Sequence, residues 1–320
     1  MEDHMIEMIP RIFPFPKYRA LAILMLFTHI AGVAVGCTLW GAAGNRVRDG
    51  GVLVAKNRDW SPDHVQYLKM VHPRQGYRFF GLFSDGNEFP GLKAGVNEYG
   101  LVVMSATAST IPLKERLQLP RQEKLLQTLL TSCRSIDEAL AKKRLFRGPR
   151  FLLLADHHGI ATVEIAPSGR FLVERKDHGV LFHTNHFKNP ELQEFNRVSR
   201  TTSLVRNETI GRLLHEHNAP LEMHHFINMS QDRSQGPDNS IWRTGDKLSS
   251  KTISTWIVSM VPGETPRVYV RLTNPGEKEE YLHFLLPEVF SRPPGRFSWP
   301  TLAKSGTQKN HRRNDESNRF

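Results

Sequence analysis

Cys37 directly follows a hydrophobic segment, residues 18–36, and begins a stretch whose pattern is typical of paired β-strands. Cleavage between Gly36 and Cys37 would place a thiol and a free α-amine on one residue. An α-amine has a pKa of about 7.7–8.0 and a cysteine thiol one of about 8.5, so near neutral pH the amine can accept the thiol proton. Such a residue is a nucleophile with its own base. The sequence therefore predicts attack on an electrophilic carbon by the Cys37 thiolate.

The segment before Cys37 has the features of a secretory signal peptide. Basic residues precede an apolar run, residues 20–30, and small residues follow at Ala34 and Gly36. The run is short for a membrane-spanning helix, so a retained anchor is the second choice. We predict a signal peptide or leader over residues 1–36 with transient membrane contact. The expected location is secreted or periplasmic, with a membrane-anchored form as the alternative.

A second fate for Cys37 stays open, because a small residue before a cysteine also ends a bacterial lipobox. Residues 34–37 lack the usual leucine three positions before the cysteine, and a lipidated Cys37 could not act as a nucleophile. The rival interpretation is a lipid-anchored or membrane-tethered binding protein with Cys37 lipidated or internal. Mass spectrometry of the mature amino terminus separates the two.

Composition argues against several other kinds of partner and site. The 320 residues carry a formal charge of +11, but the basic residues are scattered and no nucleic-acid-binding motif is present, so no nucleic-acid partner is expected. Two cysteines, Cys37 and Cys133, cannot form a disulfide framework. The 15 histidines lack the spacing and partners of a zinc site, so we expect no metal and no other cofactor.

The elements that must position Cys37 alternate short β-like runs with turns. Residues 38–43 and 52–60 are expected to form a hairpin that returns to the cysteine. Further strands are expected at 77–83, 92–97, 101–106, 151–155, 160–166, 171–174, 180–185, 253–261, 267–272 and 281–286. Helices are expected over 121–143, 199–217 and 221–228. Loops 61–76 and 84–92 are expected to line the pocket, and the pattern as a whole predicts an α+β layered domain.

Several motifs follow Cys37 in a fixed order. They are Asp-Gly-Gly at 49–51, Lys-Asn-Arg-Asp-Trp at 56–60, Asn-Glu-Tyr-Gly-Leu at 97–101, His-Thr-Asn at 183–185 and Asn-Ser-Ile-Trp-Arg at 239–243. This set resembles the N-terminal-nucleophile hydrolases of the choloylglycine hydrolase and isopenicillin-N acyltransferase group, and its last motif is closer to the acyltransferase branch. The resemblance spans residues 37 to about 286. It implies a four-layer αββα sandwich with the nucleophile at a strand start between the sheets.

The same resemblance implies roles for individual residues. Cys37 corresponds to the nucleophile, and Asp59 to the acid that binds and orients the free α-amine. Asn185 corresponds to the amide donor of the oxyanion hole, where one donor stabilises the transition state by roughly 3–4 kcal/mol. Arg243 corresponds to a deep arginine that pairs with Asp59 or holds the site together.

Two departures affect the supporting residues. The bile-salt branch has an arginine where this chain has Lys56, and a lysine cannot reproduce a bidentate fork. Either Arg58 substitutes, or the amine–thiol pair is tuned differently. The second oxyanion contributor is expected around residues 105–107, with Thr107 included.

Together these features predict a domain over residues 37–288, followed by a basic polar, disordered tail over 289–320. The predicted activity is cleavage of a linear amide C–N bond in a small-molecule substrate, or its formation by acyl transfer, through an acyl-thioester on Cys37. The sequence does not separate hydrolase from acyltransferase. It is also compatible with a homo-oligomer.

Overall fold

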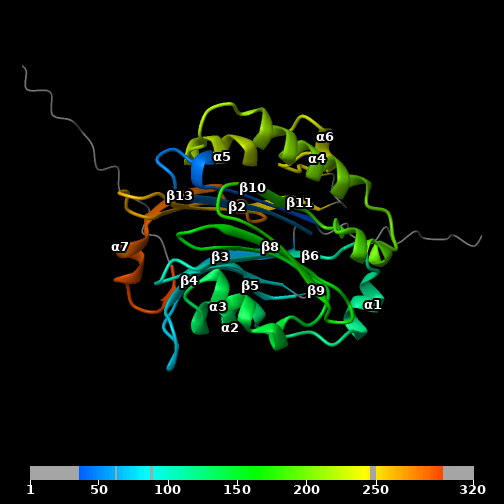
Figure 1. Cartoon of the computed structure of the whole chain (residues 1–320), viewed down its shortest axis with the longest axis horizontal. Helices are drawn as coiled ribbons and strands as arrows, with labels where there is room; N and C mark the ends of the chain where they lie inside the picture. Colours follow the sequence, from blue (N-terminus) through cyan, green and yellow to red (C-terminus); the bar gives the residue numbers. More distant parts are fainter. Residues whose placement is uncertain (1–35, 62, 87–88, 246–249, 298–320) are drawn as a thin grey trace, which may run out of the picture. The chain divides into compact units, whose positions relative to one another are not determined.

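Two antiparallel β-sheets form the centre of the protein in the computed structural model, which describes residues 36–61, 63–86, 89–245 and 250–297 (Figure 1). The six-stranded sheet, in spatial order, consists of β10 (Gly179–His183), β1 (Gly36–Ala43), β2 (Val52–Trp60), β11 (Lys251–Met260), β12 (Arg267–Leu272) and β13 (Glu280–Leu285). The eight-stranded sheet consists of β14 (Gly295–Arg296), β3 (Val65–Val71), β4 (Phe79–Asp85), β5 (Gly91–Asn97), β6 (Val102–Thr107), β7 (Arg150–Ala155), β8 (Ile160–Ile165) and β9 (Phe171–Lys176).

Helices cover the outer face of each sheet. On the six-stranded sheet lie α4 (Thr201–Glu216), α5 (Met223–Ser230) and the short α6 (Gly236–Asn239), and on the eight-stranded sheet lie α2 (Leu125–Ser132) and α3 (Ile136–Ala141) (Figure 1). The remaining helices are α1 (Leu113–Gln118), α7 (Leu286–Phe290) and the 3-10 turns η1 (Gly44–Arg46), η2 (Lys143–Leu145) and η3 (Pro190–Phe195). The predicted four-layer αββα sandwich is therefore confirmed.

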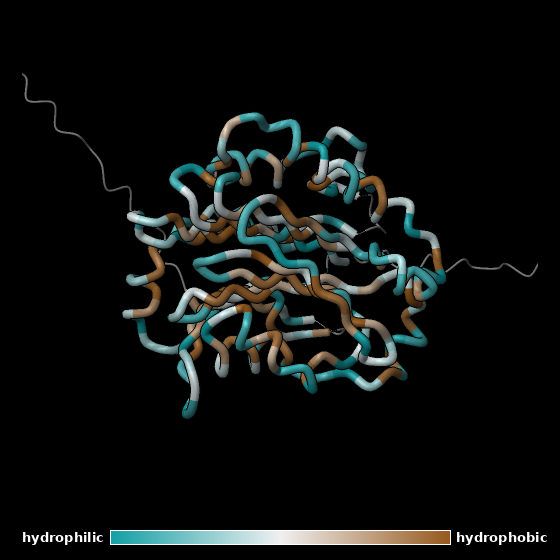
Figure 2. Tube along the Cα trace, in the orientation of Figure 1, coloured by the Kyte–Doolittle hydropathy of each residue, from teal (hydrophilic) through white to brown (hydrophobic). Residues whose placement is uncertain are grey.

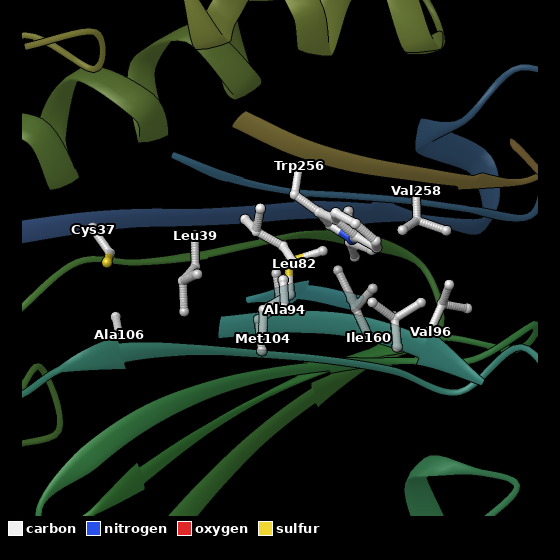
Figure 3. Packing of buried hydrophobic residues seen from close by; sticks show 14 of the residues in the cluster. Cys37, Leu39, Leu82, Ala94, Val96, Met104, Ala106, Ile160, Trp256 and Val258 are labelled. Atoms are coloured by element: carbon white, nitrogen blue, oxygen red, sulfur yellow. The ribbon is translucent and has the colours of Figure 1, made fainter. Parts of the chain in front are cut away.

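The alternation of side chains along β2 explains why both of its faces are buried. Val52 and Val54 pack into the core between the sheets, whereas Leu53 and Ala55 pack against the helices α4 and α5. Figure 2 shows hydrophobic residues along the central strands, and Figure 3 shows their side chains filling the space between the sheets. A strand covered on both sides has no solvent-facing residues, so polar residues that continue this strand are buried with it.

The helical and terminal segments differ from expectation in three places. The block expected over 121–143 is two helices, since the Ser135 side chain accepts a hydrogen bond from Glu138 N and caps a new helix. Residues 61–76, expected as a loop, contain β3. The predicted domain end at residue 288 lies inside α7, and β14 pairs with β3 beyond it, with Phe297 packed against the core. Residues 298–320 and the predicted leader, except Gly36, lie outside the described part of the chain.

Candidate active site

Cys37 lies at the start of β1, paired with Arg58 of β2. Residues directly opposite one another in an antiparallel pair share a face, so Cys37 and Arg58 both point between the sheets. Figure 3 shows the Cys37 sulfur pointing towards the eight-stranded sheet near Ala106. The thiol is 4% exposed. The hairpin returns to the cysteine as predicted, and the thiol faces the interior between the layers.

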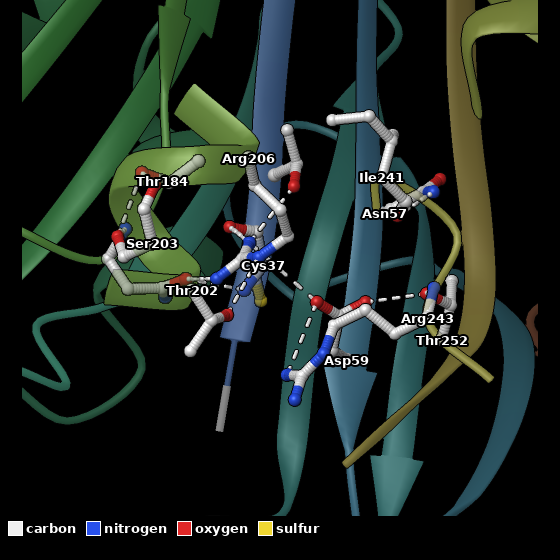
Figure 4. Close-up of polar contacts among 12 residues, drawn as sticks. Cys37, Asn57, Asp59, Thr184, Thr202, Ser203, Arg206, Ile241, Arg243 and Thr252 are labelled. Carbon is white, nitrogen blue, oxygen red and sulfur yellow. Dashed lines mark hydrogen bonds and ion pairs between the residues drawn. The ribbon is translucent and has the colours of Figure 1, made fainter. Parts of the chain in front are cut away.

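The same register places Asp59 on the opposite face of β2, towards the helices. Its partner across the ladder is Gly36, and Asn57 beside it belongs to the same face. Asn57 donates its side-chain N–H groups to the carbonyls of Ser230 and Ile241, at 2.8 and 2.9 Å. These bonds fix the segment that carries Arg243 against β2 (Figure 4).

Two buried arginines and one threonine surround the Asp59 carboxylate. Arg206 Nη1 and Arg243 Nη1 lie 3.7 and 3.8 Å from Oδ2, and the Thr252 hydroxyl donates to Oδ1 at 2.7 Å (Figure 4). Burial lowers the pKa of Arg206 to about 10, so its guanidinium remains charged near neutral pH. Oδ2 itself accepts no hydrogen bond from any described residue. The expected pairing of Asp59 with Arg243 is present, and Arg206 adds a second cation.

Arg206 also connects Asp59 to the backbone of the cysteine. Its Nη1 donates to Cys37 O at 2.9 Å and to the Thr38 hydroxyl at 3.0 Å, and its Nη2 donates to Asn185 Oδ1 at 2.9 Å. The motifs did not include Arg206. A signal was present, however, because the arginine lies on the buried face of α4, in line with Ser203 and Ile210.

Asn185 follows β10 and contacts Cys37 directly. In the uncleaved chain the Cys37 N–H donates to Asn185 Oδ1 at 2.8 Å, whereas the Asn185 side-chain N–H donates to Thr107 O at 2.9 Å. Because the Cys37 N–H and Arg206 Nη2 both donate to Oδ1, the other end of the Asn185 side-chain amide must be the nitrogen. The Asn185 backbone N–H donates to Ser203 Oγ at 2.8 Å, so the helix α4 holds the residue in place. The region expected to supply a second oxyanion contributor therefore adjoins Asn185 at Thr107.

Lys56 and Arg58 do not form the fork that an arginine at position 56 would provide. Lys56 Nζ crosses between the sheets and donates to the carbonyls of Lys93, at 2.9 Å, and Ser105. Arg58 Nη2 contacts His64 Nδ1 at 3.2 Å. Burial lowers the pKa of Lys56 to about 8 and that of Arg58 to about 10. Both cations lie on the thiol side of β2, away from the Asp59 carboxylate.

A pocket of about 860 Å³ opens onto Cys37. Segment 84–92 contributes Asp85, Phe89 and other residues to its wall, in agreement with the sequence prediction. Segment 61–76 contributes Tyr67 from β3. Residues of both sheets, including Cys37, form the walls, so a substrate in this pocket would lie against the thiol.

Two further searches concern the described residues alone. Within them, no three His, Cys, Asp or Glu side chains come together as metal ligands. No helix in this part of the chain is long and apolar enough to cross a membrane.

Comparison with known proteins assigns the chain to a family. The sequence model described as "acyl-coenzyme A:6-aminopenicillanic acid acyl-transferase" matches residues 46–277, most of the chain. The protein belongs to this family. The predicted relationship to the N-terminal-nucleophile group is thereby confirmed, and membership supports amide hydrolysis or acyl transfer in general terms. No curated protein sequence matches the chain.

Two solved structures with TM-scores above 0.5 show the same fold at low sequence identity. Two variants of the conjugated bile acid hydrolase from Clostridium perfringens superpose with TM-scores of 0.52 and 0.53, at 12% and 13% identity. Each match covers 82% of this chain and 97% of the other chain. An N-acylethanolamine-hydrolysing acid amidase orthologue from Caenorhabditis elegans matches with a TM-score of 0.46, at 13% identity, over 71% of this chain and 94% of the other.

Proposed function

We propose that the protein is an amidohydrolase or acyltransferase whose nucleophile is the thiolate of Cys37 after cleavage behind Gly36. The observation that carries this is the position of Cys37. Its thiol faces the pocket between the sheets, while its backbone nitrogen and carbonyl are held by Asn185 and Arg206. A strand-start cysteine fixed at both backbone atoms is pre-organised to attack a bound carbonyl.

The surroundings of Gly36 support the role of Asp59. A Cβ at Gly36 would stand 2.9 Å from Arg206 Nη2, 3.0 Å from Asp59 Oδ2 and 3.1 Å from Arg243 Nη1. Removal of Gly36 would vacate this space and leave the new α-amine of Cys37 at its edge, and Asp59 Oδ2, which borders the space, accepts no hydrogen bond from the described residues. Asp59 would then orient the amine as the base for the thiol.

The reaction follows from these positions. The α-amine takes the thiol proton, Sγ bonds to the amide carbon, and the carbonyl electrons move onto oxygen. The Asn185 side-chain N–H, released from Thr107 O, donates to that oxyanion. The tetrahedral adduct then expels the amine, which takes the proton from the α-ammonium. The acyl-thioester is finally cleaved by water or by an acceptor amine.

The decisive experiment combines maturation with activity. Mass analysis of the active protein should find Cys37 at the amino terminus, and Cys37→Ala should abolish amide turnover while the protein stays folded. Cys133→Ala is the matched control, since that thiol is buried against α2 and α3, away from the pocket. An active form that retains residues before Cys37 contradicts the proposal. A lipidated Cys37 would favour the tethered binding protein instead.

Processing of the leader also bears on location. We place the mature protein outside the cytoplasm, secreted or periplasmic, on the strength of the small-residue cleavage pattern before Cys37. Fractionation of the source cells tests this, with a membrane-bound mature form as the opposing result.

A further inference from the structure

The pocket at Cys37 is lined by more cationic than acidic side chains. Lys56, Arg58, Lys93 and Arg150 contribute to its inner wall, and further cations follow at the rim. Among the described lining residues the carboxylates are those of Asp85 and Glu123, and Asp85 is already paired with Arg296. A pocket with this balance raises the local concentration of anions.

Among these cations, Arg58 gives the strongest support for an anion-binding site. Its side chain is 1% exposed, and its guanidinium lies 4.8 Å from the centre of the Trp60 ring. Nη2 contacts His64, whereas Nη1 finds no hydrogen-bond partner among the described residues. Among the described residues, no carboxylate lies within ion-pair distance of Arg58. A buried guanidinium with an unused donor is costly until an acceptor arrives.

The charges of the neighbouring cations also favour a bound anion. Burial, followed by the charges of Arg58 and Lys56, lowers the pKa of Lys93 well below its usual value, and burial and Arg121 lower that of Arg150 to about 10. These groups oppose one another's charged forms in the empty pocket. An anion among them would relieve this repulsion and favour the protonated lysines.

We propose that the pocket binds an anionic group, a carboxylate, sulfate or phosphate carried by the substrate close to the scissile carbonyl, with Arg58 as its principal donor. This inference rests on the function proposed above for Cys37. Any oxygen acceptor that reaches Arg58 Nη1 would satisfy this donor, but an anionic oxygen would also compensate the buried positive charge. Trp60 and Phe89 supply apolar wall beside the cations, so the rest of the substrate can be hydrophobic.

The first test does not depend on amide turnover. Iodoacetate and iodoacetamide are nearly the same size, and both alkylate a thiolate with loss of iodide, but only iodoacetate is an anion. The ratio of their rate constants at Cys37 cancels the thiolate fraction. At low ionic strength we expect this ratio to exceed that of the unfolded chain about tenfold or more, and to fall as salt is added.

Variants show which cations are responsible. Arg58→Gln should lower the ratio at least about fivefold, and Arg121→Gln, an exposed rim position that tolerates substitution, should lower it less. Arg212→Gln, on the exposed face of α4 and paired with Glu216, removes an equal charge elsewhere and should leave the ratio unchanged. A wild-type ratio within about twofold of the unfolded chain overturns the proposal, as does a raised ratio that neither Arg58→Gln nor Arg121→Gln lowers.

The second test asks which part of the amide carries the anion. Glutaryl-4-nitroanilide is compared with pentanoyl-4-nitroanilide for the acyl side, and 4-pentanamidobenzoate with pentananilide for the amine side. We expect kcat/KM to favour the anionic member of one pair about tenfold or more. Preference for the neutral member in both pairs refutes an anionic substrate even though the amidase function stands. If no amide is cleaved, the proposed function fails, and the alkylation ratio alone decides whether the anion site exists.

Discussion

Gly36 and Asp59 face each other across the β1–β2 ladder, and the glycine lies close to that carboxylate and its two arginines. The ideal Cβ of any other residue would come within 3.1 Å of Asp59, Arg206 and Arg243 together. The residue before the predicted cut is thus as constrained as the nucleophile itself. A small residue there suits the fold of the precursor, and the cleavage proposed behind Gly36 also calls for one.

Replacement of Gly36 by valine should therefore impair maturation. The branched side chain has to displace Arg206 or Arg243, and this disturbs the hydrogen bonds from Arg206 to Cys37 O and Asn185. We expect mature protein to accumulate at least several-fold more slowly, measured by intact mass after expression. Gly50→Asn is the control, because its added Cβ meets no atom within 4 Å and asparagine tolerates a positive φ. Normal maturation of the valine variant would show that the precursor does not hold Gly36 in this position.

Asp59→Asn should destabilise the protein and slow turnover. It removes the negative charge between two buried arginines, and loss of one partner from such a buried cluster costs about 3–5 kcal/mol. Thr252→Val keeps the charge but deletes the hydroxyl that donates to Asp59 Oδ1 and accepts from the Arg243 backbone N–H, and should cost less, about 1–3 kcal/mol. Urea unfolding of both variants measures the difference. An Asp59→Asn protein as stable as the wild type would mean that Arg206 and Arg243 do not depend on this carboxylate.

Asn185→Ala should act mainly on the chemical step. The oxyanion forms only in the transition state, so loss of its donor should lower kcat by roughly 10²–10³-fold with a smaller change in KM. Asn185→Asp keeps the shape but replaces the donor by a carboxylate, and should be at least as inactive. Asn189→Ala, at the start of η3, is the matched control, because it removes a side-chain amide outside the site. A fall of less than about fivefold in a folded Asn185→Ala protein would leave the oxyanion to backbone N–H groups.

The motifs selected four residues that the fold brings together, and three of these lie in or directly after strands of the six-stranded sheet. Cys37, Asp59 and Arg243, far apart in the sequence, lie close together in the structure (Figure 4), and Asn185 accepts a hydrogen bond from the Cys37 N–H. Arg206 was missed because a helical arginine is ordinarily a surface residue, and only its place on the buried face of α4 distinguishes it.

Other features left weaker traces in the sequence. β3 alternates buried Leu68 and Met70 with more exposed neighbours, a period-2 pattern that was present but short. β14 consists of two residues, too few for any periodicity, and Phe297 beside it packs on Phe80 and Phe284. Tertiary contacts of this kind determine a structure that local pattern cannot predict.

Acid should destabilise the protein through two histidines held neutral, His64 and His186. Burial, reinforced by Arg58 for His64 and by His183 for His186, lowers both pKa values to about 4. An unfolded histidine titrates near 6.5, so between pH 6.5 and 4 the unfolded chain binds more protons and stability falls as pH falls. Each histidine contributes a slope of about 1.4 kcal/mol per pH unit in this window.

The free energy of unfolding in urea at pH 7 and pH 5 tests this prediction. We expect a loss of roughly 2–4 kcal/mol from the two histidines together. His64→Gln removes one titrating group while a side-chain oxygen can still accept from Arg58 Nη2, so it should reduce the loss by about half. His158→Gln, at an exposed position, is the matched substitution outside the buried sites. A wild-type stability that is flat between pH 7 and 5, or a His64→Gln profile identical to the wild type, would show that the pKa of His64 is not lowered in the folded protein.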